Sequence, residues 1–302
     1  MPKDKLLYSD ERENIKQIAI YLRELFIEEP SNEIFETLYD LWETKVSGRL
    51  WDYGLYNDYL EFGKIVLECA KEIPDQQIKL KLLGEVGYVC MERGMYDLAE
   101  SYFSESLEYY ISTQDSEGQC RSLRYLATLS LRQNKLDFAR EYINQGLNII
   151  IQNEHIRNYT WKFNQSEFYS LRGEIELNDR KPVSAKTYFS KAFRVSRTLP
   201  KKSEYYQLGH LRSLGRCLYF LGNYKKAVFM YKFCLKKSKE VNRLDLIVSA
   251  SIDLAETLLM VGENELARKY LNEAIDLSED NYPLLVEKAI NLLNSFSKHV
   301  AA

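Results

Sequence analysis

The sequence predicts an all-α solenoid, a stack of antiparallel helix pairs, and three observations support this fold class. Residues 80–279 contain five similar segments, each with an alanine at the same position, at intervals of 40, 46, 42 and 40 residues. Self-similarity at a fixed period of this length is typical of repeat proteins. Small and bulky residues recur at fixed offsets from that alanine, and glycine and proline are scarce (13 and 6 of 302 residues). The five marker alanines are Ala99, Ala139, Ala185, Ala227 and Ala267.

Each segment is predicted to fold as helix, tight turn, helix. The residue seven positions after the marker is small, and those four and eight positions after it are bulky, so all three share one helical face. Twelve positions before the marker lies Gly87, Ala127, Gly173, Gly215 or Ala255. Small residues on this face let a neighbouring helix approach closely. Five positions before the marker, where the first helix should end, lies Gly94, Asn134, Arg180, Gly222 or Gly262. Glycine and asparagine tolerate the left-handed conformation that ends a helix.

This unit resembles the tetratricopeptide repeat, most closely in the stretches "LLGEVGYVCMERGMYDLAESYFSESL" and "HLRSLGRCLYFLGNYKKAVFMYKFCL". The resemblance implies a right-handed superhelix in which the first helices of successive repeats line a concave, peptide-binding groove. These repeats are longer than the common repeat of 34 residues, and in this they are similar to kinesin light chains and bacterial signalling arrays. The third repeat departs most, with Arg172 in the first helix and Pro182 in the turn. Proline is acceptable in the first turn of a helix.

Helices are also expected on both sides of the repeats. Residues 10–28 form an amphipathic pattern with Ser9 as N-cap, and the Glu29-Pro30-Ser31 segment ends it. Residues 33–46 and 54–72 are predicted to form a degenerate helix pair divided near Ser47-Gly48. This pair is rich in aromatic residues: Trp42, Trp51, Tyr53, Tyr56, Tyr59 and Phe62. Pro283 opens a last helix that reaches about Lys298. We therefore expect an N-terminal cap and degenerate pair over 1–79, five repeats over 80–279 and a C-terminal cap over 280–302.

Composition argues against several classes of protein. The chain has no apolar run of signal-peptide or membrane-spanning length, which predicts a soluble, cytoplasmic protein. Five cysteines without a C-x-x-C spacing predict reduced core residues, and we expect no metal and no cofactor. The three histidines, His155, His210 and His299, are far apart, and no nucleophile elbow, phosphate loop or zinc motif is present. We therefore expect that the protein is not an enzyme.

Charge is distributed unevenly along the chain. Residues 161–243 contain 19 Lys or Arg against 6 Asp or Glu, whereas the whole chain has 41 against 44. One interpretation is that Lys186, Lys191, Lys225, Lys226, Lys232 and Lys236 lie on solvated outer faces of second helices. The other is a positive surface that attracts an acidic partner.

The resemblance implies a groove lined by the first helices, and carrying that groove over by position gives candidate binding residues. The groove-facing residues would be Tyr88 and Met91, Arg121, Arg124, Thr128 and Leu131, Ser170 and Glu174, Arg212, Arg216 and Tyr219, and Ile252 and Glu256. Arginine binds carboxylates in a two-pronged manner, and tyrosine supplies flat contact area. The arginines could instead pair with Glu174, Glu256 or other acids and only align the stack. Both interpretations stay open. In the family that these repeats resemble, the chaperone-binding members hold a carboxylate with Asn, Lys and Arg in the groove. The equivalent row here is Tyr88, Thr128, Glu174, Arg216 and Glu256 and contains no asparagine, so we do not expect binding of chaperone tails.

The leading functional hypothesis is a protein- or peptide-binding adaptor, scaffold or regulatory subunit with a partner that could be acidic. Binding of nucleic acid through the basic middle segment is an alternative, but the acidic flanks and the lack of a recognition motif disfavour it. A structural role, with oligomers formed through the aromatic N-terminal pair, is a third class. The sequence identifies no partner and no oligomeric state, and it predicts no contact with a membrane.

Overall fold

The computed structural model describes residues 3–153, 156, 158–200, 204–278 and 281–300. These residues form helices joined by short turns and contain no strand. The chain divides into two compact units, residues 1–90 and 91–302, and each is considered by itself. The division predicted at residues 79 and 279 stays a prediction, since α5 (Gln76–Glu92) runs across the first position and residue 279 is outside the described part.

The first unit contains α1 (Lys3–Glu28), α2 (Asn32–Asp40), a π-helical turn η1 (Leu41–Ser47), α3 (Gly48–Tyr53), α4 (Tyr56–Ala70) and most of α5. Helix α1 begins at Lys3 and not at residue 10, because no glycine or proline interrupts residues 3–9. The predicted cap Ser9 lies within this helix, and its side chain is outside the described part. The predicted break at Ser47-Gly48 is also wrong. Gly48 is helical, and the chain turns at Gly54, where φ is 68°.

Aromatic side chains of the first unit build its core. Trp42, Tyr56, Tyr59 and Phe62 are buried, and the Trp42 ring meets the Tyr59 ring edge-on at 4.7 Å between centroids. The side chain of Tyr53 is outside the described part. Because these four rings fill the interior of their own unit, they are not available as the oligomerising surface considered above.

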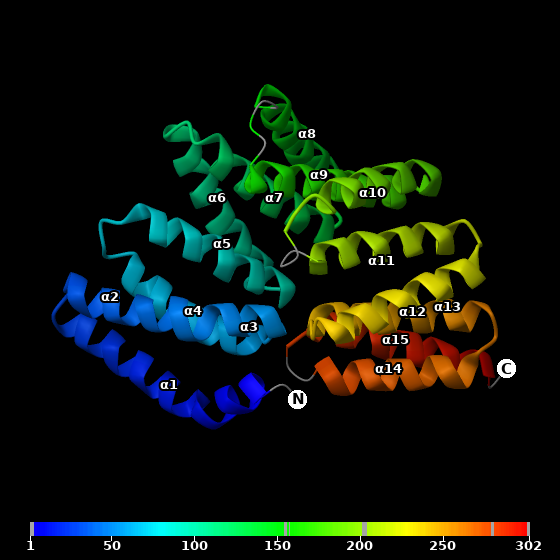
Figure 1. The fold of residues 1–302 in the computed structure, drawn as a ribbon, viewed down its shortest axis with the longest axis horizontal. Coiled ribbons are helices and arrows are strands. Elements are labelled where there is room, and N and C mark those ends of the chain that lie inside the picture. Colours follow the sequence, from blue (N-terminus) through cyan, green and yellow to red (C-terminus); the bar gives the residue numbers. More distant parts are fainter. Residues whose placement is uncertain (1–2, 154–155, 157, 201–203, 279–280, 301–302) are drawn as a thin grey trace. The chain divides into compact units, whose positions relative to one another are not determined.

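The second unit is a stack of antiparallel helix pairs, drawn in Figure 1 from green to red. The first helix of each pair contacts its own second helix, and that second helix contacts the next first helix. First helices also touch one another directly, α7 with α9, α11 with α13 and α13 with α15. This arrangement is the predicted all-α solenoid. The helices are α6 (Tyr96–Ser112), α7 (Ser116–Arg132), α8 (Leu136–Gln152), α9 (Tyr159–Asn178), α10 (Pro182–Ser196), α11 (Glu204–Phe220), α12 (Tyr224–Glu240), α13 (Leu244–Met260), α14 (Asn264–Ser278) and α15 (Pro283–Val300).

The tight turns lie where the sequence predicts them. Gly94, Asn134, Arg180, Gly222 and Gly262 all adopt the left-handed conformation, with φ between 57° and 83°. Arg180 does so at φ 59° although it is neither glycine nor asparagine. Pro182 occupies the first turn of α10, as expected. The helix that opens at Pro283 is also confirmed as α15.

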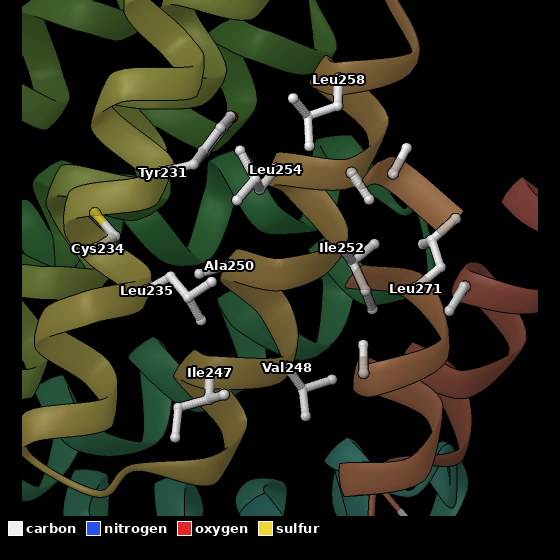
Figure 2. Packing of buried hydrophobic residues seen from close by; sticks show 14 of the residues in the cluster. Tyr231, Cys234, Leu235, Ile247, Val248, Ala250, Ile252, Leu254, Leu258 and Leu271 are labelled. Atoms are coloured by element: carbon white, nitrogen blue, oxygen red, sulfur yellow. The ribbon is translucent and has the colours of Figure 1, made fainter. Parts of the chain in front are cut away.

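Small residues at the predicted positions receive bulky side chains from the adjacent helix. All five marker alanines are fully buried, and so are Phe103, Ile143, Phe189, Tyr231 and Leu271, each at most 1% exposed. Figure 2 shows this packing around α13, whose Leu254 side chain lies toward Tyr231 of α12 and whose Ile252 lies toward Leu271 of α14. The helix-helix contact is therefore a filled, close-packed layer.

The five cysteines are free and buried, as predicted. Cys234 occupies the small position seven residues after its marker alanine, with 1% of its surface exposed. Burial raises the pKa of Cys120, Cys217 and Cys234 to about 12, so these thiols stay protonated and unreactive at neutral pH.

We predict that Gly146→Ala destabilises the protein. A β-carbon at this position would lie 2.0 Å from Cζ of the fully buried Phe168, so ring and helix would have to move apart. The expected loss is about 1–3 kcal/mol in the free energy of unfolding measured by urea denaturation. Gly209→Ala in α11 is the matched control, because nothing lies within 4 Å of its β-carbon. It should stabilise by about 0.4–1 kcal/mol. Equal effects of the two changes would contradict this account.

Candidate functional site

Ion pairs connect the first helices of the second unit to one another. Nη1 of Arg216 in α11 donates to both carboxylate oxygens of Glu174 in α9, at 2.7 Å each. Attraction by Glu174 is the main reason that the pKa of Arg216 lies above its ordinary value. Near the start of the unit, Nη2 of Arg132 donates to Glu92 Oε1 at 2.6 Å.

Asp253 in α13 forms ion pairs with side chains of two neighbouring helices. Nε of Arg212 lies 3.2 Å from Oδ2, and Nζ of Lys288 in α15 lies 3.3 Å from Oδ1. Burial alone would raise the pKa of Asp253, but the positive charges of Arg212 and Lys288 outweigh burial and lower it. Lys288 also contacts Glu256 at 3.3 Å. Arg212 and Arg216 thus form ion pairs with acidic residues of neighbouring first helices.

A second group of polar residues has buried side-chain atoms without hydrogen-bond partners. Six side-chain atoms in α7, α9 and α11 have no hydrogen-bond partner and almost no exposed surface. Two of them, Arg172 Nε and Arg212 Nε, lie 3.4 Å and 3.2 Å from the carboxylates of Glu176 and Asp253. The other four are Arg124 Nε, Asn164 Nδ2, Glu167 Oε1 and His210 Nε2. Nε2 of His210 and Oε1 of Glu167 are 3.5 Å apart, too distant for a good hydrogen bond. Buried polar groups in proteins are normally paired, and each exception needs a cause such as a bound water or ligand. We call these four residues the polar cluster.

The polar cluster is largely buried and bordered by aromatic rings. Asn164 and His210 are 1% and 3% exposed, whereas the side chain of Glu167 keeps 21% of its surface. The guanidinium of Arg124 lies over Phe163, 5.0 Å from the ring centroid, and over Tyr125 at 4.5 Å. Tyr206 packs against Phe163 with 4.5 Å between centroids. The cluster thus combines hydrogen-bonding groups with flat apolar surface.

Burial changes the proton affinity of two members of the cluster. It raises the pKa of Glu167 to about 7, against the attraction of Arg124, and lowers the pKa of His210 to about 4. On acidification Glu167 therefore takes up its proton first, and His210 then faces an uncharged carboxyl group. At neutral pH His210 is a neutral imidazole that can donate or accept a hydrogen bond.

The predicted site residues have different roles. Tyr88 belongs to the first unit, where its ring packs on Trp51 at 5.3 Å. Arg121 pairs along its own helix with Glu117 at 3.6 Å, and Thr128 donates to the backbone oxygen of Arg124. Tyr219 lies near Glu256, and its burial raises its pKa to about 12.

Two side chains predicted to face the groove do not do so. Met91 and Ile252 are completely or almost completely buried and belong to the core. Of the predicted arginines, Arg124 belongs to the polar cluster. Whether any of the predicted residues contacts a partner stays a prediction.

Residues Asn164, Glu167 and His210 were not among the predicted site residues. They lie one to three turns closer to the helix N-terminus than the row chosen from the repeat register. The available signal was the spacing of Asn164 and Glu167, three residues apart on one face of a predicted helix. His155 and the side chain of His299 are outside the described part. Among the described residues, no group of three or more His, Cys, Asp or Glu could hold a metal ion.

We predict that Arg216→Met destabilises the protein by about 1–3 kcal/mol, because Glu174 loses a two-pronged, half-buried hydrogen-bond partner. Arg194→Met is the control, since Arg194 in α10 is exposed, and it should change stability by less than about 0.5 kcal/mol. Thermal or urea unfolding gives both values. A loss no larger than that of the control would show that the ion pair contributes no stability.

We predict that the imidazole of His210 titrates near pH 4, well below its ordinary pKa of 6.5. Since the folded pKa is below the unfolded one, this histidine stabilises the fold above pH 6.5, and that contribution is lost as the pH falls toward 4. NMR of the ring protons, assigned with a His210→Gln variant, gives the midpoint. Glu167→Gln should leave it low, because burial and not a neighbouring charge is the cause. A midpoint near 6.5 would contradict the buried position.

Comparison with known proteins agrees with this fold. The sequence profile of the tetratricopeptide repeat family matches residues 79–152. Comparison with the sequences of characterised proteins gives no match. No helix in the described part is both long and apolar enough to cross a bilayer.

Several solved structures share the fold at low sequence identity. One is a STAND-family signal-transduction ATPase with a tetratricopeptide repeat sensor from Pyrococcus horikoshii (16% identity, TM-score 0.56). The similarity covers 88% of this chain but 40% of that one, so the chain spans less than half the length of this relative. A second is aspartyl phosphate phosphatase F from Bacillus subtilis (15% identity, TM-score 0.55, 92% and 76% coverage). A third is the Rap conjugation gene regulator of plasmid pLS20 in complex with the Phr* peptide (11% identity, TM-score 0.59, 94% and 96% coverage).

These likenesses concern the fold. The marker alanines, the left-handed turns and the filled small-residue positions agree with the profile match in residues 79–152. Residues 79–152 match the tetratricopeptide repeat family, and the same helix-pair architecture continues through α15.

Proposed function

We propose that this protein is a non-catalytic repeat scaffold that binds a peptide or an extended protein segment at the polar cluster. The observation that carries the proposal is the set of four unsatisfied atoms of this cluster on α7, α9 and α11. Leaving such atoms unpaired costs about 1–3 kcal/mol each. A ligand that pairs them would recover this free energy on binding.

The chemistry of the cluster suits a peptide backbone. Arg124 and Asn164 offer N–H donors to a carbonyl or carboxylate oxygen, while Glu167 offers an acceptor to an N–H group. The cluster contains no serine, threonine or cysteine that could act as a nucleophile. We therefore propose binding and not catalysis for this site.

Aromatic rings beside the cluster would contact side chains of the ligand. Tyr205 and Tyr206 lie 3.9 Å apart between ring centroids, and Tyr159 stacks on Phe163 at 6.1 Å. Aromatic residues are enriched among the contacts that dominate binding energy. An acidic group on the ligand would be favoured beside Arg124, whose guanidinium has no carboxylate within ion-pairing distance in the described part of the chain.

Two of the similar structures support this kind of role. The plasmid regulator is described in complex with a peptide, and the repeats of the archaeal ATPase are described as a sensor. We propose by analogy that the present chain acts as an adaptor or regulatory subunit. Its reduced, buried thiols fit a reducing compartment such as the cytoplasm.

The test begins with a random peptide display library selected against the immobilised protein. Affinity of the enriched peptides is then measured by fluorescence anisotropy for the wild type and for Arg124→Ala and Asn164→Ala. Each substitution should weaken binding roughly tenfold or more, because it removes a desolvated hydrogen-bonding group from the site.

The matched control is a double variant, Lys186→Ala with Arg194→Ala. Both residues are exposed on α10. It should leave the affinity unchanged. Circular dichroism verifies that all variants stay folded. Failure to enrich any peptide, or peptides that bind every variant equally, would rule out the polar cluster as the site.

A further inference from the structure

Helix α12 carries a second feature, on the side that faces away from the core. Lys225, Phe229, Lys232 and Lys236 follow one another at spacings of four, three and four residues, so they share one face. Lys226, Phe233 and Lys239 flank this stripe. Phe229 is 74% exposed and Phe233 is 42% exposed. We call these seven residues the α12 outer face.

The charge of the α12 outer face is not neutralised. In the described part of the chain, none of its five lysines lies within ion-pairing distance of a carboxylate. The pair between Lys237 and Glu240 lies beside it. Helix α10, two helices earlier, contains no acidic residue.

The fold does not require the α12 outer face. The opposite side of the helix supplies the core residues Ala227, Tyr231, Cys234 and Leu235, all at most 5% exposed. Two phenylalanines left in water gain nothing for the stability of the chain itself. Exposed apolar groups ringed by charge are typical of interaction surfaces.

We infer that the α12 outer face docks on an anionic lipid surface. Lysines on a helix face gain attraction from acidic headgroups, and four to eight of them on one face are a recognised pattern for such binding. Phe229 and Phe233 lie at the centre of the lysines, where their rings can enter the boundary between headgroups and acyl chains. The sequence predicted no membrane contact because it lacks a spanning segment. A helix that lies on the surface does not need one.

The phenylalanines favour lipid over the other anionic partners. Double-stranded nucleic acid offers phosphate to the lysines but no apolar layer to the rings. Proteins that bind single strands combine a basic groove with stacking rings, whereas these residues lie on the exposed side of one helix. The peptide site on α7, α9 and α11 is separate, so this inference does not depend on the proposed function.

The test is flotation of the full-length protein with two kinds of vesicle. One contains phosphatidylglycerol and phosphatidylcholine in a ratio of about 3:7, so that its surface is anionic, and the other is pure phosphatidylcholine. We expect binding to the anionic vesicles alone, weakening with added salt. Phe229→Ala with Phe233→Ala should reduce partitioning roughly tenfold or more. Lys225→Gln with Lys232→Gln and Lys236→Gln should reduce it roughly 100-fold.

Matched controls lie elsewhere on the chain. Phe138→Ala removes a 56% exposed phenylalanine from α8, and Lys45→Gln with Lys64→Gln and Lys71→Gln removes the same charge from the first unit. Both should bind vesicles like the wild type. Absence of binding to anionic vesicles at low salt, or equal losses in test and control variants, would overturn the inference. So would binding of a single-stranded oligonucleotide that depends on the same residues when vesicles do not bind.

Discussion

The contact between a small residue and a ring of the adjacent helix sets the spacing on which the second unit depends. A β-carbon at Gly173 would lie 2.8 Å from Phe189, and one at Gly215 would lie 2.8 Å from Tyr231. Helices in such contact are restricted to a single separation and a single register, because protein interiors are packed as densely as organic crystals. With the register set, residues about 40 positions apart meet across first helices, as Arg216 and Glu174 do. The ion pairs are thus a consequence of the packing.

The same packing explains why the repeat fold could be predicted and the site could not. The marker alanines, the turn residues and the small residues reflect local backbone geometry. The residue type at each of these positions is enough to predict it. Arg180 shows that the register prevails over residue preference, because it adopts the left-handed turn without being glycine. In the first unit no regular repeat supplies a register, so the sequence predicts the break near Ser47-Gly48, whereas the chain turns at Gly54. A glycine can either continue a helix or end it, and tertiary contacts decide which.

Partners of charged side chains depend on angles and distances that spacing alone does not give. The repeat register puts Arg124, Arg212 and Arg216 on first helices. It does not show which of them lies close to a carboxylate. Arg212 and Arg216 form ion pairs with Asp253 and Glu174, whereas Arg124 lies over aromatic rings beside atoms that lack partners. His210 looked isolated in sequence because its neighbour Glu167 comes from another repeat. Which buried polar atoms lack a hydrogen-bond partner depends on such distances, and only coordinates reveal them.

The central claim is that the polar cluster on α7, α9 and α11 receives a peptide. A crystal structure of the protein with a peptide that it binds is the most direct measurement. The account predicts peptide density beside Phe163, with backbone or carboxylate oxygens within hydrogen-bond distance of Arg124 and Asn164 and an N–H group directed at Glu167. Density on the outer faces of the second helices, with the four cluster atoms still unpaired, would contradict it.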